Sequence, residues 1–322
     1  MHKSSHYLKV LSMGALSGLA ALCLATPAWA EQSSEDPDAA ESMLSNDEIA
    51  KELINPVTAL RSLGNDLEYR TYQGSLPESG DMSAWIYLFK PSIPFQLSNG
   101  KNLLLRATIP FYFDQPVWET YFGHPIWEVD RSYADFLLRQ SPQVTPDSGR
   151  FLPGHDHLAD FSFDVAYGGV SERGLISMFG IAGVLPTSQD ISASRHQYLL
   201  GPEVAIGKSA DWGVIGAWVT HLMDFTGDSS FSTNETSLKI FFAYGLGNGW
   251  QIVSNPTILY DWEADSGNEL LLPIGGGFAK TTRFGSTPVK LAFELQRYVE
   301  TPERFGPEWL FTFSITPVIS DW

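Results

Sequence analysis

The chain has 322 residues, with 37 acidic and 20 basic side chains and a formal net charge of −17 at pH 7. A chain this acidic, with no basic stripe along it, is unsuited to nucleic acid, so we expect no nucleic-acid partner. Aromatic residues make up 13% of the sequence, and they recur at the ends of alternating segments, as described below.

Residues 1–30 have the parts of a secretory signal peptide. Lys3 and Lys9 supply positive charge, an apolar stretch follows, and a small-x-small pattern ends at Ala30. The apolar stretch is shorter than the ~20 residues that a membrane-spanning helix needs, which argues against an anchor. We therefore expect a cleavable signal. Its removal takes Cys23, the only cysteine, and leaves no disulfide and no thiolate metal site.

Residues 31–65 are expected to form an acidic leader followed by a short helix. The leader is rich in acids, serine and proline and has no apolar period, as is typical of disordered segments. Ser45 and Glu48 match a capping box at the start of a helix, and Pro56 predicts its end. The segment is either a periplasmic plug or a loose stretch before the next domain.

Residues 66–322 show an alternation of apolar and polar side chains. Leu103 and Leu105 fall on one face, for example, while Leu104 and Arg106 fall on the other. The alternating segments run to ~10 residues or more, the length of a tilted membrane strand, whereas soluble strands mostly have about five or six. A soluble sandwich also alternates, so the signal peptide decides in favour of a membrane barrel.

Aromatic side chains stand at the ends of these segments, as in the two girdles of membrane barrels. They include Trp85, Trp212, Trp218, Trp250, Trp262 and Trp309. About twelve strands are expected, beginning near Leu67, Ala84, Lys101, His157, Leu175, Gln197, Trp212, Ser237, Trp250, Glu269, Val289 and Trp309. Short and long links alternate. We predict an all-β fold, an antiparallel up-and-down transmembrane β-barrel in a bacterial outer membrane.

Two stretches depart from the alternation. Residues 114–156 are long and rich in aromatics and proline, which fits an extracellular loop, a folded-in constriction loop or a further hairpin. The chain ends in Trp322, as barrel strands often end in an aromatic residue. Pro317 lacks an N–H for the ladder, however, so we expect the last strand to bulge or end there.

Charged residues in or beside the strands are expected to face the lumen. They are Asp160, Asp164, Glu203, Lys239, Asp261, Glu269, Lys290 and Glu294. In a water-filled lumen these charges would set the preference for ions or substrates, whereas in a packed lumen they would form internal salt bridges. Eight strands nearly fill with side chains and sixteen leave a channel, so about twelve strands fit both outcomes.

Signals for an enzyme or a metal site are weak. His221 lies near Asp224 in a chain rich in serine, but no G-x-S-x-G motif is present. His155, Asp156 and His157 would need a further ligand from elsewhere to hold a metal ion. We therefore expect no enzyme activity, no metal and no cofactor.

Three consecutive glycines, Gly275, Gly276 and Gly277, have no strand-to-helix context and are no phosphate loop. Glycines in a strand allow another segment to pack closely or the strand to bend sharply. Residues 265–268 are rich in oxygen ligands, but no calcium loop follows, so a turn is expected.

An ordered set of motifs accompanies these features. It comprises Asn55, Pro56, Pro94, Trp262, Asp265, Ser266, Gly267, Asn268, Gly275, Gly276, Gly277 and Lys280, with Leu185-Pro186-Thr187 and Gly201-Pro202 between them. The set resembles a family of outer-membrane β-barrel transporters associated with the meta-pathway of phenol degradation, whose members often carry the label neuromedin U. Ser188-Gln189 replaces the family's threonine-alanine pair, so the substrate is not carried over.

The resemblance implies a passive transporter or channel for small molecules, with hydrophobic or aromatic compounds as candidates. Its partners would be outer-membrane lipid and a small-molecule solute. Two alternatives stay open at this point. One is a lipid-acting enzyme of the outer membrane with His221 as its base, and the other is a structural barrel with a closed lumen.

Overall fold

The computed structural model describes residues 44–120, 149–152, 156–188, 194–227 and 232–319. The expected signal peptide, the acidic leader, His155 and Trp322 lie outside the described residues. No helix among the described residues is long and apolar enough to cross a membrane.

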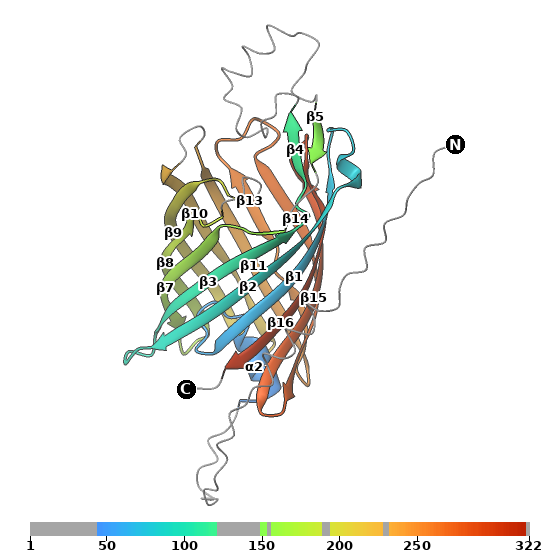
Figure 1. Cartoon of the computed structure of the whole chain (residues 1–322). Helices are drawn as coiled ribbons and strands as arrows, with labels where there is room; N and C mark the ends of the chain where they lie inside the picture. The colour runs from blue at the N-terminus through green and yellow to red at the C-terminus, as the bar shows by residue number, and fades with distance from the viewer. Residues whose placement is uncertain (1–43, 121–148, 153–155, 189–193, 228–231, 320–322) are drawn as a thin grey trace, which may run out of the picture. The chain divides into compact units, whose positions relative to one another are not determined.

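Within the described residues, twelve antiparallel strands close into a barrel (Figure 1). They are β1 (Arg61–Gln73), β2 (Ser83–Gln96), β3 (Asn102–Phe113), β7 (Phe161–Val170), β8 (Leu175–Leu185), β9 (Gln197–Ala210), β10 (Gly213–Gly227), β11 (Asn234–Gly247), the interrupted pair β12 (Trp250–Ser254) and β13 (Thr257–Asp261), β14 (Leu270–Phe284), β15 (Thr287–Glu300) and β16 (Gly306–Ile319). Each strand pairs with its neighbours in the chain, and β1 pairs with β16 to close the ring. The predicted all-β antiparallel barrel of about twelve strands is confirmed.

The two ends of the barrel differ in the length of their links. One end, the short-turn rim, carries residues 97–101, 171–174, 211–212, 248–249 and 285–286. At the other end, the long-loop rim, longer links separate β1 from β2, β3 from β7, β8 from β9, β10 from β11, β13 from β14 and β15 from β16. This alternation is the predicted one, and in membrane barrels the short turns face the periplasm.

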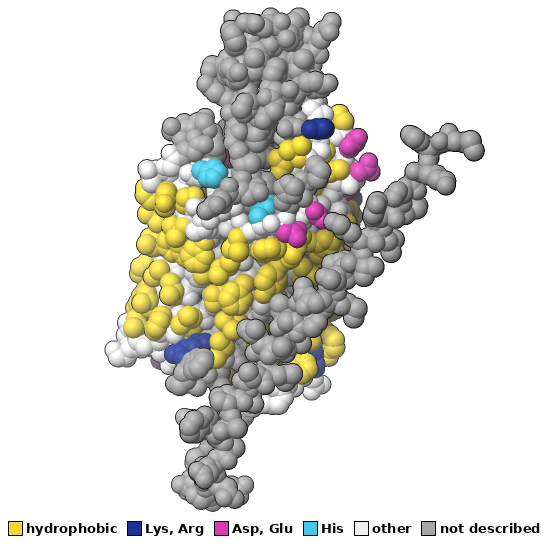
Figure 2. Space-filling model, in the orientation of Figure 1, with side chains coloured by type: hydrophobic (Ala, Val, Ile, Leu, Met, Phe, Trp, Pro, Cys, Tyr) yellow, Lys and Arg dark blue, Asp and Glu magenta, His cyan; other side chains and the backbone are white. Residues whose placement is uncertain are grey.

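The outer surface of the barrel is apolar. Leu103 and Leu105 are 39% and 43% exposed on the outside, whereas Leu104 between them is fully buried on the inside. Figure 2 shows hydrophobic side chains gathered in a broad band across the barrel, with charged side chains toward its ends. The predicted faces are therefore confirmed for this strand. Trp218 is an exception to the expected girdle, because it points inward and stacks under the Arg106 guanidinium at 4.1 Å.

The short helix α2 (Asn46–Glu52) begins with the predicted capping box. The Glu48 backbone N–H donates to Ser45 Oγ at 3.2 Å, and the Ser45 backbone N–H donates to Glu48 Oε2 at 2.7 Å. The hydrogen bonds that Ser45 donates lower the pKa of the Glu48 carboxyl, because they favour its charged form. The helix ends at Leu53, ahead of Pro56.

Residues 44–60, which we call the plug, are fixed to the barrel at the short-turn rim. Asp47 accepts a hydrogen bond from the Gly249 backbone N–H at 2.5 Å, and Arg283 donates to the Leu44 carbonyl at 2.9 Å. Val57 is 2% exposed within an inward-facing hydrophobic cluster from β3, β7, β8, β9, β10 and β11. Residues 44–60 therefore pack against the barrel and are not a loose stretch, while their position on the periplasmic side stays a prediction.

The long link between β3 and β7 contains a hairpin, one of the three expected possibilities. β4 (Val117–Thr120) pairs with β5 (Gly149–Leu152) in a separate two-stranded sheet. The hairpin packs on the long-loop rim, because Phe151 contacts Phe305 at 4.9 Å between ring centroids and Phe305 stacks on Tyr72 at 4.6 Å. The two-residue strand β6 (His157–Leu158) then pairs with β3.

The last strand differs from its prediction. β16 continues through Pro317 to Ile319, and its register with β1 is the same on both sides of that residue. Pro317 pairs with Val289 of β15, while its pairing with β1 is interrupted. The expectation that the strand bulges or ends at Pro317 is wrong, because a missing N–H can be tolerated when only one neighbouring ladder loses a bond.

Candidate functional site

A cavity of about 400 Å³ lies inside the barrel, between the plug and the inner faces of several strands. It follows β1 from Ser62 to Arg70, roughly 25 Å of strand. The charged residues of its lining are Asp66, Glu68, Arg70, Lys90, Arg106, Lys239, Lys290 and Glu294. The lining therefore carries more basic than acidic groups, in a chain that is strongly acidic as a whole.

The structure places the eight expected lumen residues in three locations. Lys239, Lys290 and Glu294 line the cavity. Asp164 and Glu203 lie beside it, in contact with Arg106.

The other three lie near the long-loop rim and do not line the cavity. The Asp160 carboxylate accepts hydrogen bonds from the backbone N–H groups of Ser188 and Arg195. Asp261 and Glu269 likewise accept from backbone N–H groups in the 262–269 link. The fold of the links, which alternation does not encode, decides what these three residues contact.

Five charged lining residues were missing from the expected set: Asp66, Glu68, Arg70, Lys90 and Arg106. Three of them lie on β1, which begins at Arg61, earlier than the expected start near Leu67. Lys90 and Arg106 carry the same signal as the expected residues, because each is a charged residue on the polar face of an alternating strand.

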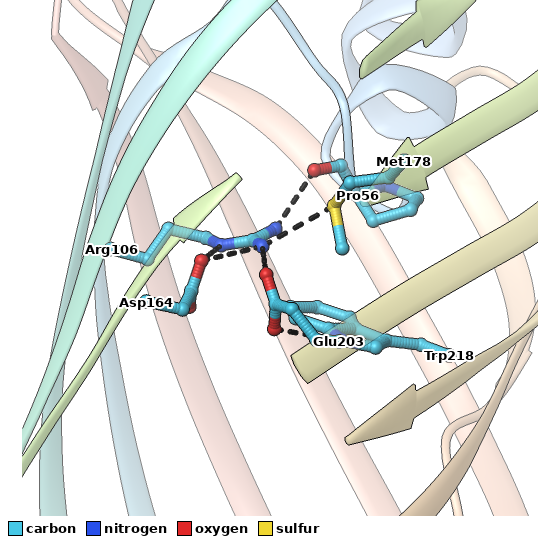
Figure 3. A network of polar contacts seen from close by, with 6 residues as sticks. All are labelled: Pro56, Arg106, Asp164, Met178, Glu203 and Trp218. Atoms are coloured by element: carbon cyan, nitrogen blue, oxygen red, sulfur yellow. Dashed lines mark hydrogen bonds and ion pairs between the residues drawn. The ribbon is translucent and has the colours of Figure 1, made fainter. Parts of the chain in front are cut away.

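Arg106 is the centre of a polar network that joins five barrel strands to the plug, with Met178 Sδ of β8 3.4 Å from Arg106 Nη2 (Figure 3). Its Nε donates to Asp164 Oδ2 at 2.8 Å, and its Nη2 donates to Glu203 Oε1 at 3.3 Å. Trp218 Nε1 donates to the second Glu203 oxygen at 3.1 Å. The remaining guanidinium nitrogen, Nη1, donates to the Pro56 carbonyl at 2.8 Å. A buried guanidinium with this many partners fixes the position of the plug.

Two further acids of the lining form ion pairs within the wall. Asp66 pairs with Lys90 across β1 and β2, and Glu68 pairs with Arg70 at 2.7 Å along β1. These acids are mostly buried, with 9% and 11% of their side chains exposed. The charges of both pairs are thereby compensated inside the protein, and each leaves little free charge for a solute.

Glu294 binds a neutral partner instead. Its carboxylate accepts from the Asn255 backbone N–H at 3.0 Å and from Asn255 Nδ2 at 2.7 Å. Asn255 stands at the break between β12 and β13, and β14 lies between that break and β15. Gly277 of β14 pairs with Glu294 on one side and with Val253 on the other.

The absence of a side chain at Gly277 lets the Glu294 carboxylate reach across β14. A Cβ at Gly277 would lie 1.7 Å from the Phe293 carbonyl oxygen, and one at Gly275 would lie 2.0 Å from that of Leu295. This close approach of strands is one of the two roles expected for the glycine block.

Two lysines of the lining have no such partner. Within the described residues, Lys239 and Lys290 form no ion pair and no hydrogen bond. Lys290 is 6% exposed. The Lys239 ammonium lies over the Trp218 ring, with Nζ 6.0 Å from the ring centroid.

The remaining motif residues lie in the plug, in β2 and at the two rims, outside the cavity lining except for Asn55 and Pro56. Asn55 Oδ1 accepts from the Val57 backbone N–H at 3.1 Å within the plug, and Pro94 is buried in β2 opposite Leu104. In the 262–269 link, Trp262 is 58% exposed and residues 265–268 form the predicted turn, closed by a backbone hydrogen bond of 2.9 Å. Lys280 donates to the Asn248 carbonyl at the short-turn rim.

The histidines expected for chemistry are dispersed. His221 Nδ1 is 2.8 Å from Thr236 Oγ1, whereas Asp224 accepts from the Thr233 backbone N–H at 2.6 Å. His157 lies on β6. Among the described residues, no group of three or more His, Cys, Asp or Glu side chains could hold a metal ion.

Comparison with known proteins shows the fold. No family model matches the chain, and no curated protein sequence matches it. An outer membrane channel from Pseudomonas putida F1 is 11% identical, over 89% of this chain and 100% of its own, with a TM-score of 0.53. This chain therefore has the barrel fold of that outer-membrane protein.

Two other solved structures are less similar. Outer membrane phospholipase A from Escherichia coli is 10% identical over 87% of this chain and 99% of its own, with a TM-score of 0.40. A Pseudomonas aeruginosa FadL homologue is 10% identical over 86% and 95%, with a TM-score of 0.38. Membership of the phenol-degradation transporter family stays a prediction.

Proposed function

We propose that this protein is a passive channel of a bacterial outer membrane, which lets small molecules pass along the inner cavity. The observation that carries the proposal is the cavity itself, which follows the inner face of β1 for most of its length. A structural barrel with a fully packed lumen would leave no cavity of this size beside the plug. Passive passage of a solute along the cavity would need no cofactor.

The outer surface supports the membrane location. A continuous apolar band, such as that around Phe179, Val204 and Ile206, costs free energy in water and is stabilised against lipid tails. The expected signal peptide would deliver the chain to the periplasm, from which outer-membrane barrels insert. The short-turn rim with its plug would then face the periplasm.

The lining favours small solutes that have polar groups. Trp218 and Tyr298 offer ring surfaces to an aromatic or hydrophobic part of a solute. The row of charged groups between them loses hydration if an entirely apolar molecule displaces water, and this loss is costly. We therefore propose amphipathic small molecules, aromatic ones included, rather than bare hydrocarbons.

Conductance of the purified, folded protein in planar lipid bilayers tests the proposal. We expect single-channel steps for the wild type. Ser314→Trp should reduce them, because Ser314 lines the cavity. Phe313→Trp is the matched control, since Phe313 is the next residue along β16 and is 46% exposed on the outer face. A wild-type barrel that conducts no ions and passes no solute in liposome swelling would overturn the proposal.

The same vesicles test the enzyme alternative. His221 and Thr236 form a histidine–hydroxyl pair, the part of a nucleophilic site that is present. Hydrolysis of vesicle phospholipid that disappears in His221→Ala would favour a lipid-acting enzyme. We expect no hydrolysis, and conductance that is the same in His221→Ala and the wild type.

A further inference from the structure

We propose that Lys239 and Lys290 form a binding site for a small organic carboxylate inside the barrel. Both side chains line the cavity, Lys239 from β11 and Lys290 from β15. Within the described residues neither ammonium forms an ion pair or a hydrogen bond. A buried ammonium without a partner is costly, so the wall offers two cationic groups that an anion would stabilise.

The surrounding charges leave this site positive. The charged groups that act on Lys239 are Lys90, Asp66, Glu294 and Arg106, and those that act on Lys290 are Glu294, Lys239 and Asp66. The charge of Asp66 is compensated by Lys90, and that of Arg106 by Asp164 and Glu203.

Glu294 is the one acid near the two lysines that has no cationic partner within 4 Å in the described chain. Both its oxygens accept hydrogen bonds from Asn255, and neither forms an ion pair with a lysine of the described chain. Two ammonium groups against one carboxylate leave a net positive site. Rings of lysine or arginine select anions in other pores by the same physical means.

The chemical class of the ligand follows from the neighbours of the two lysines. Thr257 is the cross-strand partner of Lys239, and Thr316 is that of Lys290. Both threonines line the cavity and can donate a hydroxyl hydrogen bond to a carboxylate oxygen. The Trp218 ring next to Lys239 offers a flat apolar surface. An aromatic carboxylate therefore fits both the charges and the ring.

This inference deepens the proposed channel function by naming its substrate class, but binding can be measured without conduction. Isothermal titration of the folded protein in detergent with benzoate is the direct test. We expect saturable binding by the wild type, and about tenfold weaker binding for each of Lys239→Gln and Lys290→Gln, because each removes one charge-assisted contact. Benzyl alcohol, which keeps the ring and lacks the charge, should not bind.

Lys280→Gln is the matched control. Lys280 is also a strand lysine, but it lies at the short-turn rim beside Trp250 and does not line the cavity. Its variant should bind benzoate as the wild type does. Equal benzoate binding by the wild type and by the Lys239→Gln/Lys290→Gln double variant would overturn the inference, as would no binding at all.

Reversal potentials in a potassium chloride gradient separate this inference from the proposed channel. A conducting wild type should prefer chloride, and the double variant should lose that preference. Conduction without benzoate binding overturns the carboxylate site alone. Benzoate binding that depends on the lysines, in a protein that does not conduct, overturns the channel alone.

Discussion

Arg106 shows how one side chain can hold several parts of this molecule together. It contacts acids on two other strands, the face of Trp218 and the carbonyl of Pro56. Asp164 and Glu203 are inward-facing acids, and without Arg106 they would be buried charges with no cationic partner. The network therefore has a structural role, and it differs in this from the uncompensated lysines of the cavity.

Replacement of Arg106 should destabilise the barrel strongly. Arg106→Met leaves Asp164 and Glu203 buried without their cation, and removing one partner of a buried ion pair costs about 3–5 kcal/mol. Urea unfolding of the protein in lipid vesicles measures this loss. Arg297→Met is the control, since Arg297 is exposed on the outer face beside Trp309, and its effect should stay below about 1 kcal/mol. Equal losses in the two variants would contradict the structural role of Arg106.

Gly277 is the second residue with a definite requirement. A Cβ there would lie 1.7 Å from the Phe293 carbonyl oxygen and in the path of the Glu294 carboxylate. Gly277→Ala should lower the free energy of unfolding by roughly 1–3 kcal/mol, because β14 and β15 must move apart. Gly245→Ala, whose Cβ would have its nearest contact at 3.5 Å, is the matched strand control. A Gly277→Ala protein as stable as this control would show that β14 and β15 can move apart without a measurable loss of stability.

At the scale of elements, the plug is the part that decides how much of the lumen is open. Its helix is specified locally by the Ser45 and Glu48 capping box, and its position is specified by contacts distant in sequence. The Asn102 side chain, for example, donates to the Val57 carbonyl at 2.8 Å. The apolar cluster around Val57 then fills the side of the lumen opposite β1, β15 and β16.

A charge at Val57 should release the plug and widen the passage. Val57→Asp places a carboxylate without a partner among Leu104, Ile176 and Phe241, at a cost of several kcal/mol that release of the plug avoids. We expect larger single-channel conductance in planar bilayers. Val57→Ala keeps the site apolar, loses roughly 1–2 kcal/mol of packing and should conduct as the wild type does. Unchanged conductance in a folded Val57→Asp protein would show that the plug does not limit the passage.

The interrupted strand is a further element-scale feature. β12 and β13 are separated by Asn255 and Pro256, and proline cannot donate to the ladder. Asn255 uses its free backbone N–H to bind Glu294, and the Pro256 carbonyl still accepts from Ile240 at 3.0 Å. The break thus supplies a polar group to the cavity wall while the barrel remains closed.

At the scale of the whole molecule, the barrel is apolar outside and encloses a cavity lined by charged residues beside its apolar cluster, which differs from a soluble protein. Val204 is 55% exposed in the middle of β9, and its cross-strand partner Phe179 on β8 is 62% exposed. The strands of a soluble sandwich would bury such a pair. The outward face therefore needs lipid, and the cavity needs water or a solute.

The depth dependence of a charged substitution tests this location. Val204→Arg should lower the free energy of unfolding in lipid vesicles by about 2–4 kcal/mol, since the arginine lies near the bilayer midplane. Leu175→Arg, at the short-turn end of β8, should cost about 0–1 kcal/mol because it reaches the interface. Similar small effects at both positions would place the band in water instead of lipid.

Most of the fold could be predicted, and only part of the site. Period-two alternation marks each strand locally, and the capping box marks α2 locally, so both were found. The inward direction of Lys239, Lys290 and Glu294 follows from the same period. The contacts of Asp160, Asp261 and Glu269 depend on how the links of the long-loop rim fold, and Trp218 points inward because Arg106 and Glu203 bind it there.

The sequence by itself determined the barrel, its strand number and the two faces of its strands, because alternation and turn residues act over a few neighbouring positions. Only the tertiary structure decided which charges meet. Arg106 is 97 residues from Glu203, and Glu294 is 39 residues from Asn255, and no local pattern relates them. For the same reason, only closure of the barrel around its plug decided that the lumen is part core and part cavity, and that two lysines there lack partners.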